Sequence, residues 1–182
     1  AGLQAEIEIE KDHLSKHDGA IGDGDHGITM SIGFRAVNAE IGKLNLETVG
    51  PAEIMATAAT AFLNAVGAST GPLYATAFRR ASEALAETNE DDLTSHADMI
   101  RAFVTGISER GKAQRGDKTM LDAWMPAADA AEKALTVKNT PALFWSSVID
   151  AANTGAIGTR SMIATKGRAA RVGERSLGHI DP

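Results

Sequence analysis

Residues 51–67, PAEIMATAATAFLNAVG, carry the clearest signal of secondary structure in the chain. Their apolar positions lie three and four residues apart, which is the spacing of one face of an α-helix. Those positions are Ile54, Ala58, Ala61, Phe62 and Val66. A proline starts the stretch and a glycine ends it, the usual places of these residues around a helix. The pattern predicts a helix over residues 51–66 that buries this stripe in a core.

The rest of the chain shows the same spacing on both sides of this segment. Alanine is abundant, aromatic residues make up only 4%, and no run of alternating β-branched residues indicates a strand. The fold class is therefore all-α, a helical bundle, and no linker divides residues 1–182, which we expect to form one domain. We expect helices over residues 2–16, 27–43, 51–66, 72–88, 94–110, 118–135 and 141–158. Thr94 is expected to cap the fifth of these helices and Gly111 to end it.

The composition excludes several classes of protein. The chain has no cysteine, so a disulfide framework and a cysteine-containing zinc site are excluded. Its net charge of -6 disfavours a general electrostatic affinity for nucleic acid. No apolar run approaches the roughly 20 residues that span a bilayer, and residues 1–13 lack the apolar stretch of a secretory signal. We therefore expect a cytoplasmic protein without a nucleic-acid or membrane partner.

Glycine and charge gather in four connections of the expected bundle. Residues 159–182 contain five basic and two acidic residues, a local charge of +3, so the rest of the chain carries -9. Because alternate connections of a bundle lie at one end, these segments can form one site with a basic side that attracts an anion. The connections read HDGAIGDGDHG (17–27), GASTGP (67–72), GKAQRGDKT (111–119) and TKGRAARVGERSLGHIDP (165–182).

Three carboxylates, those of Asp18, Asp23 and Asp25, fall within eight residues of the first connection. Like charges this close are costly unless a cation lies between them, and oxygen ligands on a glycine-rich backbone suit Mg²⁺ or Ca²⁺. Counting from Asp23 puts Ile28 at the position where an EF-hand needs glycine, and Phe34 where it needs glutamate, so an EF-hand is excluded. The remaining alternatives are a Mg²⁺ site and a surface turn that caps the next helix.

The helix expected directly after the aspartates offers a second binding feature. The backbone N–H groups of Gly27, Ile28 and Thr29 open this helix, and a helix N-terminus attracts phosphate through its unpaired donors and its dipole. A nucleotide bound there would have its phosphates between the metal ligands and the helix. Two roles are compatible with His26, a contact with phosphate or a structural hydrogen-bond donor.

Residues 18–182 resemble a known family, the ADP- or ATP-binding L subunits (DhaL) of dihydroxyacetone kinases and the equivalent domain of single-chain kinases. The resemblance implies an antiparallel barrel of eight helices with the nucleotide at one end and two Mg²⁺ ions between aspartates and phosphates. The family continues beyond the position of Pro182 with a further helix, so we expect seven helices in this chain. The resemblance lies in four ordered motifs, AIGDGDHG (20–27), GPLYATAF (71–78), RGKAQRGDKTMLDAW (110–124) and KGRAARVGERSLGHIDP (166–182).

The resemblance also implies a set of site residues. The implied metal ligands are Asp18, Asp23 and Asp25. The implied nucleotide contacts are His26, Gly27 and Thr29 at the helix start, Ser69 and Thr70 in the second connection, Gly111 and Met120 beside the adenine and ribose, and Arg168 and Asp181 in the last connection. Two departures affect this set, because Thr29 stands where asparagine is common and GASTGP replaces the more usual GGASGP. The alternatives are Met120 as plain core, Gly111 as a helix end and Arg168 as a surface charge.

The function that the resemblance implies is phosphoryl transfer from a Mg²⁺-bound adenine nucleotide to dihydroxyacetone or a related small ketose. The ketose is held by a partner K subunit, and the sequence shows no convincing nucleophile or general base beside the aspartates. The donor is ATP, or ADP recharged by a phosphohistidine carrier of the M type, and a homodimer is compatible with the sequence. The alternatives are a nucleotide-carrying regulatory module without turnover, and a domain like that of fatty-acid kinases, whose loop reads DGDTG.

Overall fold

The computed structural model describes residues 2–67, 69–87 and 92–182. In these ranges the chain forms seven α-helices, two 3-10 helices and no β-strand. They are α1 (Gly2–Ile21), α2 (His26–Ile41), α3 (Pro51–Ala65), α4 (Thr70–Ala86), α5 (Leu93–Gly111), α6 (Leu121–Thr136), α7 (Pro141–Gly158), η1 (Thr159–Ser161) and η2 (Ala169–Ser176). The all-α prediction is confirmed, and each of the seven expected helical segments is present. No helix in this part of the chain combines the length and the hydropathy needed to cross a membrane.

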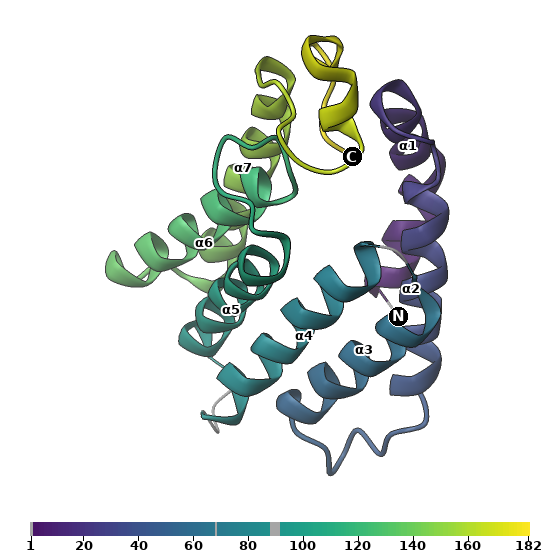
Figure 1. Ribbon diagram of the computed structural model, residues 1–182. Helices are drawn as coiled ribbons and strands as arrows, with labels where there is room; N and C mark the ends of the chain where they lie inside the picture. The colour runs from purple at the N-terminus through teal and green to yellow at the C-terminus, as the bar shows by residue number, and fades with distance from the viewer. Residues whose placement is uncertain (1, 68, 88–91) are drawn as a thin grey trace.

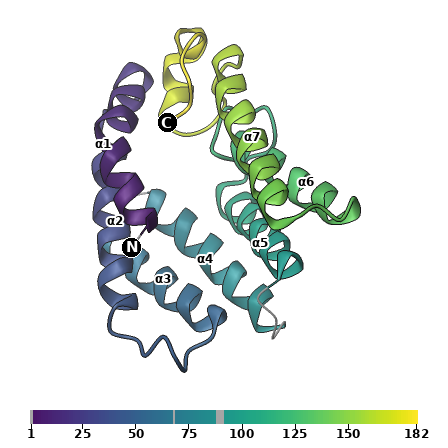
Figure 2. The ribbon, with the colours of Figure 1, turned by 180° about the vertical axis from the view of Figure 1, so that it is seen from behind.

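Helices that follow one another in the sequence pack side by side, from α1 against α2 through to α6 against α7. Figure 1 and Figure 2 show that the α1–α2 pair and the α6–α7 pair lie on opposite sides of the molecule, with α3 and α4 between them. The C-terminal segment lies between the upper ends of α7 and α1, where η1 contacts α7 and η2 contacts α1. This end of the molecule is therefore built from both ends of the chain.

The core is centred on aromatic side chains from four helices. Phe62 on α3 is fully buried and packs against Phe34 on α2 and Phe78 on α4. Phe103 on α5 lies edge-on to Phe78. Burying such a side chain stabilises the fold by about 1.5–3 kcal/mol, and edge-to-face ring contacts add to this. The predicted stripe on α3 is buried at Ala58, Ala61, Phe62 and Val66, whereas Ile54 is half-buried.

The junction of α1 and α2 differs from the expectation in one respect. Helix α1 continues to Ile21 instead of ending near residue 16, because Ile21 is itself an apolar position that α1 buries. Asp18 therefore lies in the last turn of a helix and not in a loop. Gly27, in the first turn of α2, lies against the backbone of α1, where a Cβ would come within 1.9 Å of the carbonyl oxygen of Lys11. The two helices can pack this closely only with glycine at this position.

Both ends of α5 also differ from the expectation. The N-cap is Asp92 and not Thr94, because the side chain of Asp92 accepts a hydrogen bond from the backbone N–H of Ser95, and the Ser95 hydroxyl pairs with the N–H of Asp92. This reciprocal pair satisfies two donors of the helix start at once. At the other end Gly111 is still helical, and Lys112 takes the left-handed conformation with φ of 53°. Gly111 is therefore the last helical residue and not the left-handed end of the helix.

Candidate functional site

A cavity of ≈ 680 Å³ opens at the end of the bundle where the C-terminal segment lies, and all four glycine-rich connections line it. The expectation that these connections meet in one place is confirmed. The cavity is lined by Asp18, Asp23, Asp25, His26, Thr29, Ser69, Thr70, Gly111, Met120, Arg168 and Asp181, among other residues. Of the predicted site residues, Gly27 alone does not line the cavity, because its Cα faces α1. The volume is within the range of about 300–1,000 Å³ that is usual for sites of small-molecule ligands.

Three carboxylates gather at one side of this cavity. One oxygen each from Asp18, Asp23 and Asp25 lies within 4.8 Å of the others. Asp18 is held in place by two backbone groups, since its Oδ2 accepts hydrogen bonds from the N–H of Asp25 at 2.9 Å and of His26 at 3.2 Å. Gly24 has a φ of 78°, a left-handed conformation that folds the turn back toward α1. The turn therefore brings residues from two helix ends into one acidic cluster.

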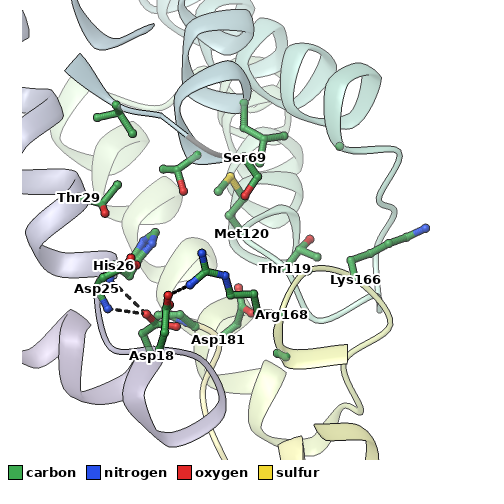
Figure 3. Close-up of a pocket in the computed structure, with 18 of the residues that line it drawn as sticks. Asp18, Asp25, His26, Thr29, Ser69, Thr119, Met120, Lys166, Arg168 and Asp181 are labelled. Carbon is green, nitrogen blue, oxygen red and sulfur yellow. Dashed lines mark hydrogen bonds and ion pairs between the residues drawn. The ribbon is translucent and has the colours of Figure 1, made fainter. Parts of the chain in front are cut away.

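The acidic cluster already has a cationic neighbour within the chain. Arg168 forms an ion pair with Asp23 through its guanidinium group. Figure 3 shows the side chain of Arg168 reaching toward the aspartates, whereas Lys166, two residues earlier, points away from them. This ion pair joins the C-terminal segment to the first connection.

The carboxylates also fit a hard metal ion. Mg²⁺ binds oxygen ligands at about 2.0–2.1 Å, so oxygens on opposite sides of one ion lie roughly 4.2 Å apart. The three carboxylate oxygens lie within 4.8 Å of one another, so small side-chain movements would bring them onto one ion. Two of the three side chains, Asp23 and Asp25, are exposed, which leaves room for water and phosphate oxygens to complete the coordination. Asp18, Asp23 and Asp25 are therefore the residues that could hold Mg²⁺.

The start of α2 offers donors beside this cluster. The N–H of His26 already donates to Asp18, and the N–H of Thr29, expected to be available, donates to the carbonyl oxygen of Asp25. The donors that remain are those of Gly27 and Ile28, where the helix dipole favours an anion. Burial lowers the pKa of His26, while the charges of Asp18 and Asp25 act in the opposite sense. The ring of His26 is therefore neutral at neutral pH and can donate one hydrogen bond without adding charge. The side chain of Thr29, one turn further along, also lines the cavity.

A second helix start faces the cavity from the opposite side. Helix α4 begins at Thr70, and Ser69 is its N-cap residue. The side chain of Ser69 makes no capping hydrogen bond, so its hydroxyl is not used to close the helix. Figure 3 shows Ser69 across the cavity from the aspartates and His26. Two helix N-termini therefore converge on the space between them, each favouring an anion by about 0.3–1 kcal/mol.

The deeper part of the cavity is apolar. Leu73, Ile107 and Met120 line it, and each also packs against the main core. Gly111 keeps a surface open here, since a Cβ at this position would come within 3.0 Å of the Leu73 side chain. Met120 is thus both part of the core and part of the cavity wall. The arrangement is a narrow apolar space beside a polar, anion-favouring mouth.

Sequence analysis did not identify Lys118, which holds this end of the molecule together. Lys118 is 1% exposed, and its Nζ donates hydrogen bonds to the carbonyl oxygens of Thr159 at 2.7 Å and His179 at 2.5 Å. The hydroxyl of Thr159 accepts a hydrogen bond from the N–H of Asp181 at 2.9 Å. These bonds join three segments that lie far apart in the sequence. Without the fold, the residue is one of two lysines in its connection.

Two aspartates shape the connection that carries Lys118. Asp122 is buried and accepts hydrogen bonds from the N–H groups of Gly116 at 2.5 Å and Thr119 at 2.9 Å. Asp117 accepts a hydrogen bond from the hydroxyl of Thr165 at 2.6 Å, which ties the connection to the C-terminal segment. The segment that carries Arg168 and Asp181 is therefore fixed at several points.

Asp181, which lines the cavity, has a strongly raised pKa. Burial raises its pKa to about 7, Lys118 acts in the opposite sense, and the charges of Asp122 and Asp18 raise it further. At neutral pH this carboxyl is therefore close to half protonated. A cation placed near it would favour the ionised form.

Comparison with known proteins places the chain in a family. The family model described as the DAK2 domain matches residues 20–182. The chain belongs to this family. Proteins that are similar over nearly the whole chain include the ADP-binding subunit DhaL of the PEP-dependent dihydroxyacetone kinase 2 of Listeria innocua, 39% identical over 99% of this chain and 83% of its own length. The corresponding DhaL subunit of Escherichia coli is 34% identical over 95% of this chain and 81% of its own length.

Longer kinases also match this chain over part of their length. The L-erythrulose 1-kinase of Mycolicibacterium smegmatis is 34% identical over 93% of this chain, which spans 29% of that protein. The crystal structure of the C. freundii dihydroxyacetone kinase in its native form has the same fold, with a TM-score of 0.75 and 24% identity over 99% of this chain and 30% of that one. The expected resemblance to the L subunits of dihydroxyacetone kinases is confirmed, and with it the assignment to a family of kinase subunits.

Proposed function

We propose that this chain binds an adenine nucleotide with Mg²⁺ and passes its terminal phosphoryl group to a small ketose such as dihydroxyacetone. The observation that carries the proposal is the convergence of three carboxylates, two helix N-termini and a guanidinium group on one cavity of ≈ 680 Å³. Phosphoryl transfer requires this combination, because catalysis comes mainly from positioning and from charge that balances the phosphate oxygens. The DhaL relatives are named ADP-binding subunits, which supports the choice of nucleotide.

Asp18, Asp23 and Asp25 would hold the metal, as two Mg²⁺ ions in the arrangement that the family resemblance implies. When bound, Mg²⁺ supplies positive charge beside the phosphates and orients them. The role of the chain is to keep the carboxylates in place. Asp18 is suited to this, because two backbone N–H groups fix its Oδ2 and leave its other oxygen available to a metal ion.

The phosphates would lie between the two helix starts. His26 and Thr29 would contact them from α2, with Gly27 contributing only its backbone N–H group, and Ser69 and Thr70 from α4. Gly111 and Met120 would border the adenine and ribose in the apolar part of the cavity. Arg168 and Asp181 would close the site from the C-terminal segment. Arg168 pairs with Asp23 here, and it has the charge and planar donors to pair with a phosphate instead.

The ketose itself would be held by a K-type partner subunit that docks where the aspartates open to solvent. The chemistry of the cavity supports this division, because the polar groups that line it match phosphate and metal. The phosphoryl donor would be ATP, or an M-type phosphohistidine carrier that recharges bound ADP. The names of the Listeria and E. coli relatives, which are PEP-dependent kinases, favour the carrier.

The test is a phosphorylation assay with dihydroxyacetone and Mg·ATP, or with a PEP-driven carrier, in the presence and absence of a K-type subunit. We expect turnover only when the partner is present, and none when Asp23→Ala replaces the wild-type chain. Ketose phosphorylation by the chain alone would show that it contains a substrate site and would contradict the division of labour. Nucleotide binding without transfer under all conditions would favour a regulatory module instead.

A further inference from the structure

Outside the cavity, α1 carries two histidines one turn apart. His13 and His17 face each other, with their Nε2 atoms 3.0 Å apart and their ring centroids 4.4 Å apart. His13 is exposed, His17 is half-buried, and neither lines the cavity. The pair is therefore a feature of the outer surface of α1 and has no part in the proposed nucleotide site.

The carboxylate of Glu10 fixes the orientation and the tautomer of His13. Glu10 Oε2 lies 3.0 Å from Nδ1 of His13, and an ionised carboxylate can only accept a hydrogen bond. Nδ1 of a neutral His13 therefore carries the proton, and its Nε2 presents a lone pair toward His17. A carboxylate that holds the outer nitrogen of a histidine in this way commonly accompanies histidine metal ligands, because it orients the ring and makes the other nitrogen more basic.

The spacing of the two Nε2 atoms suits two ligands of one ion. Imidazole nitrogens bind transition metals at about 2.0–2.1 Å, so two of them lie roughly 2.9 Å apart for a right angle at the metal and roughly 3.4 Å apart for a tetrahedral angle. The observed 3.0 Å is close to the right-angle value. Ni²⁺ and Cu²⁺ prefer such angles with nitrogen ligands, whereas Mg²⁺ takes oxygen ligands.

We propose that His13 and His17, oriented by Glu10, form a binding site for a divalent transition-metal ion of the Ni²⁺ or Cu²⁺ type. The side chain of His13 is 62% exposed, so solvent can supply the remaining ligands. On binding, His17 moves its proton from Nε2 to Nδ1, and both Nε2 lone pairs then face the ion without net proton release. The aspartates of the cavity offer only oxygen ligands, so the two sites select different metals.

The test is a calorimetric titration of the untagged chain with Ni²⁺ in the presence of excess Mg²⁺. We expect one Ni²⁺ ion per chain. His13→Ala or His17→Ala should weaken binding by about tenfold or more, and Glu10→Ala by about 10- to 100-fold. Two matched controls should leave the affinity unchanged. Glu6→Ala removes an exposed carboxylate one turn before Glu10 on the same helix, and Asp23→Ala removes a ligand of the proposed Mg²⁺ site.

A second readout identifies the ligands directly. With Cu²⁺ as the probe, electron paramagnetic resonance should show nitrogen coupling from two imidazoles in the wild-type chain and from one in either histidine variant. Ni²⁺ affinity that survives both histidine substitutions, or that is lost in either control, would assign the ion to other ligands and overturn the proposal. Absence of Ni²⁺ binding by the wild-type chain would show that the pair is only a hydrogen bond between two rings.

Discussion

The carboxylate of Asp18 caps the start of α2, because its Oδ2 accepts hydrogen bonds from the backbone N–H groups of Asp25, the N-cap residue, at 2.9 Å and of His26, the first helical residue, at 3.2 Å. Asp23 has no such backbone bond, and its recorded side-chain partner is Arg168. The two aspartates should therefore respond differently to substitution. Asp23→Ala should abolish Mg²⁺-dependent ADP binding and leave the unfolding temperature nearly unchanged. Asp18→Ala should abolish the same binding and also cost about 1 kcal/mol of stability, the usual cost of losing a cap.

Calorimetry with Mg·ADP and thermal unfolding of both variants check this prediction. Wild-type ADP affinity in a folded Asp23→Ala variant would remove the basis for a metal site. Equal loss of stability in both variants would show that Asp18 is not the cap.

Arg168 should contribute to nucleotide binding through its charge and its planar donors. Arg168→Ala should weaken ADP binding by about 1.5–3 kcal/mol, the usual contribution of a hydrogen bond to a charged group. Arg168→Lys should recover only part of this, because lysine keeps the charge but not the fork of donors. Arg171→Ala is the matched control, since Arg171 is an exposed arginine of the same segment that does not line the cavity. Normal affinity in both Arg168 variants would make this residue a surface charge.

Lys118 should stabilise the C-terminal segment and thereby the site. Lys118→Met leaves the buried carbonyl groups of Thr159 and His179 without their donor, which costs about 1–3 kcal/mol for each group that stays buried and unpaired. We expect faster proteolytic cleavage within residues 160–182 and weaker ADP binding. Lys112→Met, at an exposed lysine of the same connection with a similar φ, should change neither. Unchanged proteolysis in Lys118→Met would contradict this role.

Two glycines differ in the space around them, which gives opposite predictions for their replacement by alanine. Gly27→Ala should destabilise the fold by about 1–3 kcal/mol, because its Cβ would overlap the carbonyl oxygen of Lys11. Gly158→Ala should stabilise it by about 0.5–1 kcal/mol, since no atom lies within 4 Å of a Cβ there and its φ is -59°. Chemical denaturation of both variants measures the difference. A stable Gly27→Ala variant would show that α1 and α2 can separate without cost.

The helices were predictable because their signals are local. The stripe around Phe62 and the proline at residue 51 identify α3 without knowledge of any neighbour. The ends were harder, because a cap depends on which of several competing side chains reaches the backbone. Asp92 is the N-cap of α5 and not Thr94, because Asp92 and Ser95 form reciprocal hydrogen bonds. Helix α1 continues to Ile21 because the side chain of Ile21 is buried in the folded chain.

Some residues of the candidate site could likewise be predicted from the local sequence, and others could not. The aspartates could be found from sequence, because three carboxylates within eight residues are costly unless they meet positive charge. Lys118 could not, because its partners Thr159 and His179 lie 41 and 61 residues away and are backbone carbonyl groups that any sequence supplies. Gly27 was expected at the site, but its position is set by packing against Lys11, which no local pattern shows.

The central claim is that the three aspartates hold a metal ion against the phosphates of a nucleotide. It is tested most directly by titrating the purified chain with ADP in the presence of Mg²⁺ and again in the presence of a chelator. We expect binding with Mg²⁺ that is lost with the chelator and absent in a folded Asp23→Ala variant. ADP binding of the same affinity under both conditions would contradict the claim, because it would show that the phosphates are held without the metal ion.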